Sequence, residues 1–343
     1  MLIKISERYK PFTHQVGHKC CLPRTSLVFE IFPTKINVSD ISKKDPLQIA
    51  ALTNNLEAPV SNFLVQQDLE KGCIRVEGAA KNGFFRYIIH SSQEGDGYFI
   101  ESKVPMEWEG NTGTLSSYPS CKIERLHLGV TKKQDWDLVL RRGVIAEILP
   151  FWFLLGQLTP KYESLSEEES LLTTCMNRVQ SKEHDKICST LNDVFVAGFS
   201  GLLVPNLEDS CYRGYAQPPI VADSPLALLS AGSSLIRSLF FLENSSEELS
   251  ILPSLPPEFP SGRLIGLQVS DGSVIDIEWS KKTLRRMVFY ARSSEKKSFV
   301  FQPKIKSYRL RMSQEKKESQ RFKVGDALEF EAGCKYYFDN FQL

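Results

Sequence analysis

The feature that most constrains this chain is a proline-rich stretch at residues 252–262. It reads LPSLPPEFPSG and holds four prolines in eleven positions. Proline fixes φ and has no N–H to donate to a β-ladder, so such a run favours an ordered, extended connection. We therefore expect this stretch to join two separately folded parts of the chain.

The residues after the stretch have the pattern of β-structure. Residues 274–279 alternate between two faces with a period of two, and Asp271-Gly272 before them is a hairpin signal. Further short apolar runs predict strands at 287–291, 298–301, 307–312, 327–331 and 335–338. We expect residues 251–343 to form the linker and a C-terminal β-sandwich.

The first part of the chain also predicts strands. Short runs of β-branched and aromatic residues lie at 26–32, 72–77, 84–89 and 98–104, separated by turn-forming residues. This spacing is typical of a sandwich, so residues 1–130 are expected to form an N-terminal β-sandwich domain. One short helix is expected within residues 45–60.

The period changes in the middle of the chain, at residues 131–250. Apolar residues there recur at helical spacing, which predicts helices at 136–142, 144–157, 166–180, 184–203 and 225–242. Gly143 is the expected stop of the first helix, and Pro150 is expected to kink or restart the second. The predicted fold class is α+β, with a short helical segment between two sandwiches.

A set of motifs around the proline-rich stretch resembles a known family. The motifs are LPSLP at 252–256, FPSG at 259–262, Gly266-Leu267 and VIDIEW at 274–279, preceded by Val221-Ala222-Asp223 and the small-residue run 230–234. In this order they are similar to the last barrel helix, the linker and the C-terminal β-domain of glycoside hydrolase family 95, the inverting α-L-fucosidase-like enzymes. The resemblance covers about residues 221–300. Disaccharide phosphorylases carry a similar joint.

The resemblance implies a helical barrel of which most is missing. Six helical hairpins of ordinary length would exceed about 200 residues, whereas only five helices are predicted here. The middle segment therefore resembles a truncated remnant of an α/α-barrel. Inverting cleavage also needs an acid and a base about 6.5–9.5 Å apart, and residues 132–220 contain no motif that matches the family's acid. The catalytic residues stay unknown.

The candidate ligand-binding residues are Arg213, Tyr215 and Asp223. The first two belong to an aromatic loop at 212–219, and Asp223 falls where the family has an active-site Asp. The sequence departs from the family directly afterwards, because Ser224-Pro225-Leu226 replaces its Asn-Phe-Gly step. An ordinary surface loop, with Asp223 as N-cap of the next helix, explains the same residues.

Two further groups have alternative interpretations. Asp276 and Glu278 share one strand face, where they are either a carboxylate pair or two solvated charges. Three tryptophans are either core residues or platforms for sugar rings, and we expect core positions for Trp136, Trp152 and Trp279.

Composition excludes several function classes. A net charge of +1 provides no field for nucleic acid, and no window reaches the ~18 apolar residues of a membrane span. The eight cysteines form no C-x-x-C pair, and the five histidines are scattered, so we expect no metal and no cofactor. Unpaired thiols and the absence of a signal-peptide pattern favour the cytoplasm. The oligomeric state is not predicted.

Three functions follow from these observations. The first is a glycoside-hydrolase-derived protein, a pseudoenzyme, that binds a carbohydrate or a protein partner. The second is an active, inverting carbohydrate-cleaving enzyme that uses Asp223. The third is a purely structural or interaction protein. A cleft with facing carboxyl groups, a cleft with aromatics, or an exposed apolar patch would distinguish the three.

Overall fold

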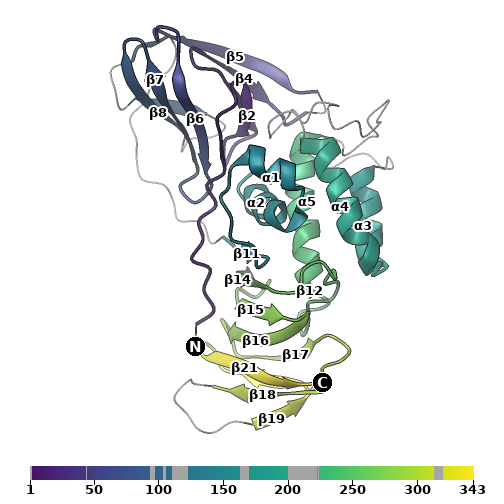
Figure 1. Cartoon of the computed structure of the whole chain (residues 1–343). Coiled ribbons are helices and arrows are strands. Elements are labelled where there is room, and N and C mark those ends of the chain that lie inside the picture. The colour runs from purple at the N-terminus through teal and green to yellow at the C-terminus, as the bar shows by residue number, and fades with distance from the viewer. Residues whose placement is uncertain are drawn as a thin grey trace.

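The computed structural model describes residues 2–43, 45–92, 97–102, 106–109, 123–162, 170–199, 222, 224–312 and 320–343. Figure 1 shows three layers, with the first strands at the top, the helices in the middle and the last strands at the bottom. Strands predominate over helices, which confirms the α+β class.

The N-terminal strands form two five-stranded sheets. The first has the order β1 (Phe12–Thr13), β6 (Ser61–Asp68), β7 (Cys73–Ala80), β8 (Gly83–Ser91) and β9 (Tyr98–Ser102). The second has the order β10 (Trp108–Glu109), β5 (Leu47–Asn54), β4 (Lys35–Asp40), β3 (Leu27–Ile31) and β2 (His18–Cys21). Their inner faces share one apolar core, to which Phe29 and Tyr87 contribute fully buried rings.

One prediction for this region is wrong. Residues 47–54 form strand β5, where a short helix was expected within 45–60. The run Ala50-Ala51-Leu52 suits a helix locally. However, β5 pairs antiparallel with β4 along its length, and Leu52 points into the core. Ladder bonds with a neighbouring strand outweigh such weak local preferences.

The five described helices lie between the two groups of sheets. They are α1 (Trp136–Arg142), α2 (Ile145–Gln157), α3 (Leu171–Gln180), α4 (His184–Phe199) and α5 (Pro225–Phe240). Gly143 ends α1 in the left-handed conformation, as its position predicts. Helix α2 continues through Pro150 without restarting, and ten of its 13 residues are buried.

The C-terminal strands form a seven-stranded and a four-stranded sheet. The larger has the order β11 (Arg125–His127), β14 (Gly262–Gln268), β15 (Val274–Ser280), β16 (Thr283–Tyr290), β21 (Lys335–Gln342), β18 (Ser307–Arg311) and β19 (Gln320–Lys323). The smaller has the order β12 (Phe241–Glu243), β13 (Glu248–Ile251), β17 (Glu295–Val300) and β20 (Leu328–Phe330). Phe289 of the larger sheet packs against Phe299 and Phe330 of the smaller one, so the two sheets form a sandwich.

Segments distant in the sequence connect the layers. Strand β11 precedes the helices in the chain but pairs with β14 in the C-terminal sheet. The N-terminal segment runs beside it, where the hydroxyl of Tyr9 donates to the carbonyl of Leu126 and His127 pairs with Glu7 at 2.9 Å. Figure 1 shows the N-terminal segment beside the C-terminal sheet, where Arg263 of β14 donates to the carbonyl of Lys4 at 3.1 Å. The helices share one continuous core with that sheet.

Candidate functional site

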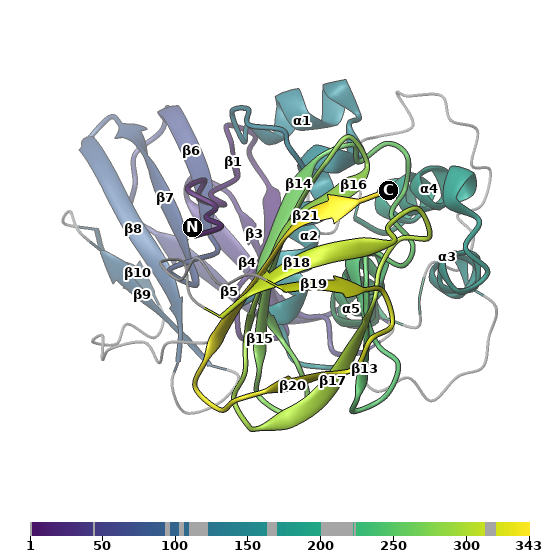
Figure 2. The same cartoon turned by 90° about the horizontal axis from the view of Figure 1, so that it is seen from below.

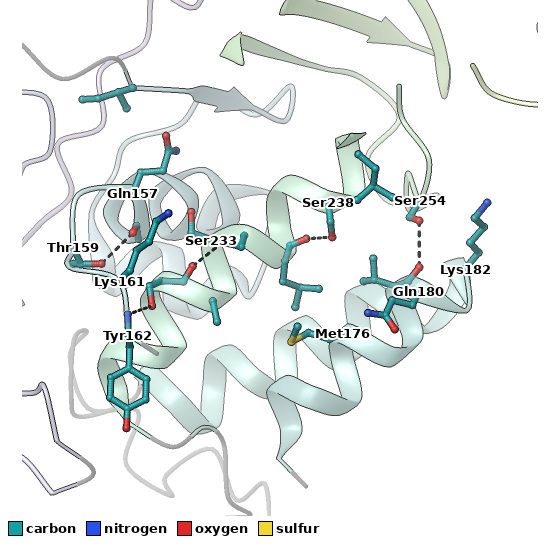
Figure 3. Close-up of a pocket in the computed structure, with 18 residues that line it drawn as sticks. Gln157, Thr159, Lys161, Tyr162, Met176, Gln180, Lys182, Ser233, Ser238 and Ser254 are labelled. Carbon is teal, nitrogen blue, oxygen red and sulfur yellow. Dashed lines mark hydrogen bonds between the residues drawn. The ribbon is translucent and has the colours of Figure 1, made fainter. Parts of the chain in front are cut away.

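A cavity lies among helices α2, α3 and α5. It has a volume of about 720 Å³, and Figure 3 shows the side chains around it. Helix α5 supplies one wall through Ser230, Ser234 and Ser238, which recur at helical spacing on one side of the helix. Helix α3 supplies the opposite wall through Met176 and Gln180.

Two glycines allow the helices around the cavity to approach closely. Gly156 of α2 lies against the backbone of α5, and a Cβ there would overlap the carbonyl of Leu229. Gly232 of α5 lies against the ring of Trp152. The indole Nε1 of Trp152 donates to the carbonyl of Leu228 at 3.0 Å, so the crossing of α2 and α5 is tightly packed. This crossing forms the back of the cavity.

Hydroxyl groups dominate the polar part of the lining. Ser230 donates to the carbonyl of Leu226 at 2.9 Å, and Ser233 donates to the carbonyl of Phe153 at 2.8 Å. Thr159 and Ser254 likewise donate to backbone carbonyls, at 3.1 and 3.3 Å. A hydroxyl has one hydrogen and two lone pairs. Ser230 already accepts from the N–H of Tyr162 at 3.3 Å, but each of these hydroxyls retains at least one free lone pair, which suits a ligand with hydroxyl or amine donors.

The cavity also offers apolar surface and donors. Met176 and Leu242 are 37% and 39% exposed, and Tyr162 contributes a half-buried aromatic ring. Lys161 and Lys182 are exposed at separate places on its rim, as Figure 3 shows. A ligand with both apolar and polar faces would find a partner for each.

Two carboxylates in or next to helix α2 are held in ion pairs. Glu124 is buried and pairs with Arg237 at 2.9 Å. Glu147 pairs with Arg142 at 2.5 Å and with Lys132 at 3.4 Å. Burial alone would raise the pKa of Glu147, but the hydrogen bond and charge of Arg142 outweigh burial and lower the pKa. A general acid in glycoside cleavage needs the opposite shift.

The three predicted ligand-binding residues lie outside the described residues. Arg213, Tyr215 and Asp223 therefore remain predictions. The N-cap of helix α5 is Ser224, whose hydroxyl accepts from the N–H of Ala227 at 3.0 Å. The expected cap at Asp223 is therefore displaced by one residue, because a hydroxyl directly before Pro225 already satisfies the helix end.

The interpretations of the tryptophans and of the acidic strand can be compared directly with the structure. Trp136, Trp152 and Trp279 are at most 2% exposed, which confirms their core positions. Glu278 pairs with Arg263 at 2.8 Å and with Arg286, while Asp276 is half-buried in a second cavity. Both carboxylates lie on the outer face, but neither is simply solvated.

Comparisons with known proteins concern the C-terminal part of the chain. None of the curated proteins compared matches the chain. In the described part of the chain, no helix combines the length and apolar character that crossing a membrane requires. Residues 244–338, which begin before strand β13 and end in β21, match the family model for the C-terminal domain of glycoside hydrolase family 95, as the resemblance at residues 221–300 predicted.

Proposed function

We propose that this protein derives from a glycoside hydrolase and binds a carbohydrate in the cavity among α2, α3 and α5 without cleaving it. The observation that carries the proposal is the lining of that cavity, where serine and threonine hydroxyls and glutamine amides surround an apolar floor. Sugars combine hydroxyl donors with apolar C–H faces, so each part of such a ligand has a partner in this lining.

The match to a C-terminal domain of glycoside hydrolase family 95 supports this ligand class, since the cavity lies on the helical layer that packs on the matching domain. Glu124 and Glu147 are both held in ion pairs with arginines, which favour the ionised carboxylate over a proton-donating acid. This supports binding over cleavage. Among the described residues, free thiols at Cys20, Cys21 and Cys175, all buried, support a reducing compartment, and we place the protein in the cytoplasm.

A blocking substitution tests the binding site. Ser234→Trp puts an indole on the exposed side of α5, where it fills the cavity without disturbing the buried face of the helix. We expect this variant to lose at least about tenfold in affinity for any oligosaccharide that the wild type retains on a glycan array, since filling the site forfeits its contacts. Ser189→Trp, at an exposed position of α4 outside the cavity, is the matched control.

A hydrolysis assay tests the absence of cleavage. Wild type and Asp223→Asn are incubated with a panel of aryl glycosides, and release of the aryl alcohol is measured. We expect no turnover above buffer in either protein. Turnover by the wild type that Asp223→Asn abolishes would establish the active glycosidase instead. Capture of a protein by the wild type and by Ser234→Trp alike, with no glycan bound, would establish the interaction protein.

A further inference from the structure

A second cavity lies on the outer face of the C-terminal sheet. It shares no lining residue with the cavity among α2, α3 and α5, which we call the helix cavity. It has a volume of about 530 Å³, and strands β15, β16 and β21 line it together with Leu2 from the N-terminal segment. Figure 2 shows these three strands in the C-terminal sheet. The opposite face of the same strands is core, where Ile275, Ile277 and Phe289 are fully buried.

The strand register explains why the lining residues meet. One row across the sheet contains Val274, Tyr290 and Lys335. The next row on the same face contains Asp276, Val288 and Tyr337. Residues two apart on a strand share a face, so these six side chains form one continuous patch. We name it the sheet patch.

A backbone irregularity orients the carboxylate of the sheet patch. The ladder between β14 and β15 shifts register between Leu264 and Leu267, and Gly266 in that bulge has φ +72°. The bulge directs the N–H of Gly266 to Oδ1 of Asp276 at 2.7 Å. Burial raises the pKa of Asp276, although this hydrogen bond and the charge of Lys335 oppose the rise. One oxygen of the carboxylate is thus anchored, and Oδ2 has no hydrogen bond within the described residues.

The aromatic side chains of the sheet patch are arranged around this carboxylate. Tyr290 and Tyr337 lie on neighbouring strands, offset by one row, and both are half-buried. The ammonium of Lys335 lies 5.9 Å from the centre of the Tyr290 ring. The sheet patch therefore combines two tyrosine rings, the carboxylate acceptor of Asp276, and donors from Lys335 and the tyrosine hydroxyls. All of them line one cavity, where a small ligand can reach them.

The balance of charge selects the class of ligand. Asp276 and Lys335 carry opposite charges, so the patch attracts neither an anion nor a cation strongly. A neutral polyhydroxylated ring can place its apolar C–H face on a tyrosine, donate a hydroxyl to Asp276 and accept from Lys335. We propose that the sheet patch is a second binding site, for a neutral sugar ring of an oligosaccharide. This site does not depend on the function proposed for the helix cavity.

The test uses the full chain with the helix cavity blocked by Ser234→Trp. Its probe is a glycan array of neutral oligosaccharides, followed by calorimetry with the tightest one. We expect the blocked protein to retain at least one oligosaccharide. Adding Tyr337→Ala or Asp276→Asn should weaken that binding by about tenfold, the usual effect of one stacked ring or one charge-assisted hydrogen bond. Asp276→Asn keeps an oxygen for the N–H of Gly266, so it preserves the bulge.

The matched control is Phe84→Ala, which removes a ring that is 50% exposed on the N-terminal sheet. It should leave the affinity unchanged. The proposal is overturned if the blocked protein retains no neutral oligosaccharide, or if Asp276→Asn and Tyr337→Ala, both folded by their melting temperatures, bind as Phe84→Ala does. Loss of glycan binding on Ser234→Trp alone would support only the helix cavity, whereas retention with sensitivity to Asp276→Asn would support only the sheet patch.

Discussion

The indole Nε1 of Trp279, in strand β15, donates a hydrogen bond of 3.0 Å to the carbonyl of Phe259, in the proline-rich joint. Both residues are buried. Phe240, at the end of α5, stacks on the same indole with ring centroids 5.2 Å apart. The joint is therefore held between the last helix and the C-terminal sheet, as an ordered connection rather than a loose linker.

This contact predicts a large loss of stability for Trp279→Phe. The substitution leaves the buried carbonyl of Phe259 without its donor and opens a void beside Phe240, which together should cost about 3 kcal/mol of unfolding free energy. Urea unfolding measures the change. Trp108→Phe is the control, because its indole also donates a hydrogen bond, to Ser102, but that bond is exposed and the side chain is only half-buried. Equal losses in the two variants would contradict the role assigned to the joint.

At the crossing of α2 and α5, we expect a glycine-to-alanine substitution to lower the stability of the protein, although the same substitution usually stabilises a helix. In an exposed helix interior, alanine is favoured over glycine by about 1 kcal/mol. At Gly232 a Cβ would overlap the ring of Trp152, so Gly232→Ala should instead lower the free energy of unfolding by about 2 kcal/mol. Thermal unfolding would detect this. The control Ser234→Ala, on the exposed side of the same helix, should be neutral or slightly stabilising, and a stabilised Gly232→Ala would show that the helices are not in contact.

A buried histidine predicts a dependence of stability on pH. His18 is 3% exposed, and burial lowers its pKa to about 3. The unfolded chain binds this proton at about pH 6.5. Between about pH 6.5 and pH 3 the unfolded state therefore holds a proton that the folded state does not. The contribution of His18 is complete above about pH 6.5 and falls as the pH falls, by up to about 1.4 kcal/mol per pH unit.

His18→Leu should remove this part of the acid sensitivity. The measurement is the midpoint of urea unfolding at a series of pH values between about 7 and 4, the range in which the histidine of the unfolded state takes up its proton. We expect a flatter profile for His18→Leu than for the wild type. Thr34→Leu, at an exposed position outside the core that has no titrating group, should follow the wild type. Identical profiles for all three proteins would mean that His18 is accessible to protons in the folded state.

The ion pair of Glu124 and Arg237 predicts a cost for removing one partner. Glu124 accepts from Arg237 and from the N–H of Gln268 at 2.8 Å, which links α5 to strand β14. Arg237→Met leaves a buried carboxylate without its cation. We expect a loss of about 2 kcal/mol, less than for a fully buried pair because Arg237 is partly exposed.

The double variant Glu124→Gln with Arg237→Met tests this explanation. It removes the unpaired charge but keeps an oxygen for the N–H of Gln268, so part of the lost stability should return. Lys186→Met, which breaks the exposed pair with Glu183, is the control and should not change the melting temperature. If the double variant is less stable than Arg237→Met, the cost comes from lost packing on Phe241 and not from the charge.

Features encoded within a few neighbouring residues were predictable from the sequence. Helix α1 ends at Gly143 and α5 begins beside Pro225, because caps and proline act on the adjacent backbone. The alternation at residues 274–279 correctly predicted β15. Apolar spacing also correctly predicted helix α2, and the expected core position of Trp152 is confirmed.

Contacts between distant residues were decided only by the tertiary structure. Residues 47–54 became a strand because β4 was available to pair with them, and β11 joined the C-terminal sheet through β14. The two cavities have the same origin, since packing brings Ser234 and Gln180 to one cavity, and strand register brings Asp276 and Tyr337 to the other. Local preferences of the backbone act over a few residues, whereas burial and ladder pairing select among them across the whole chain.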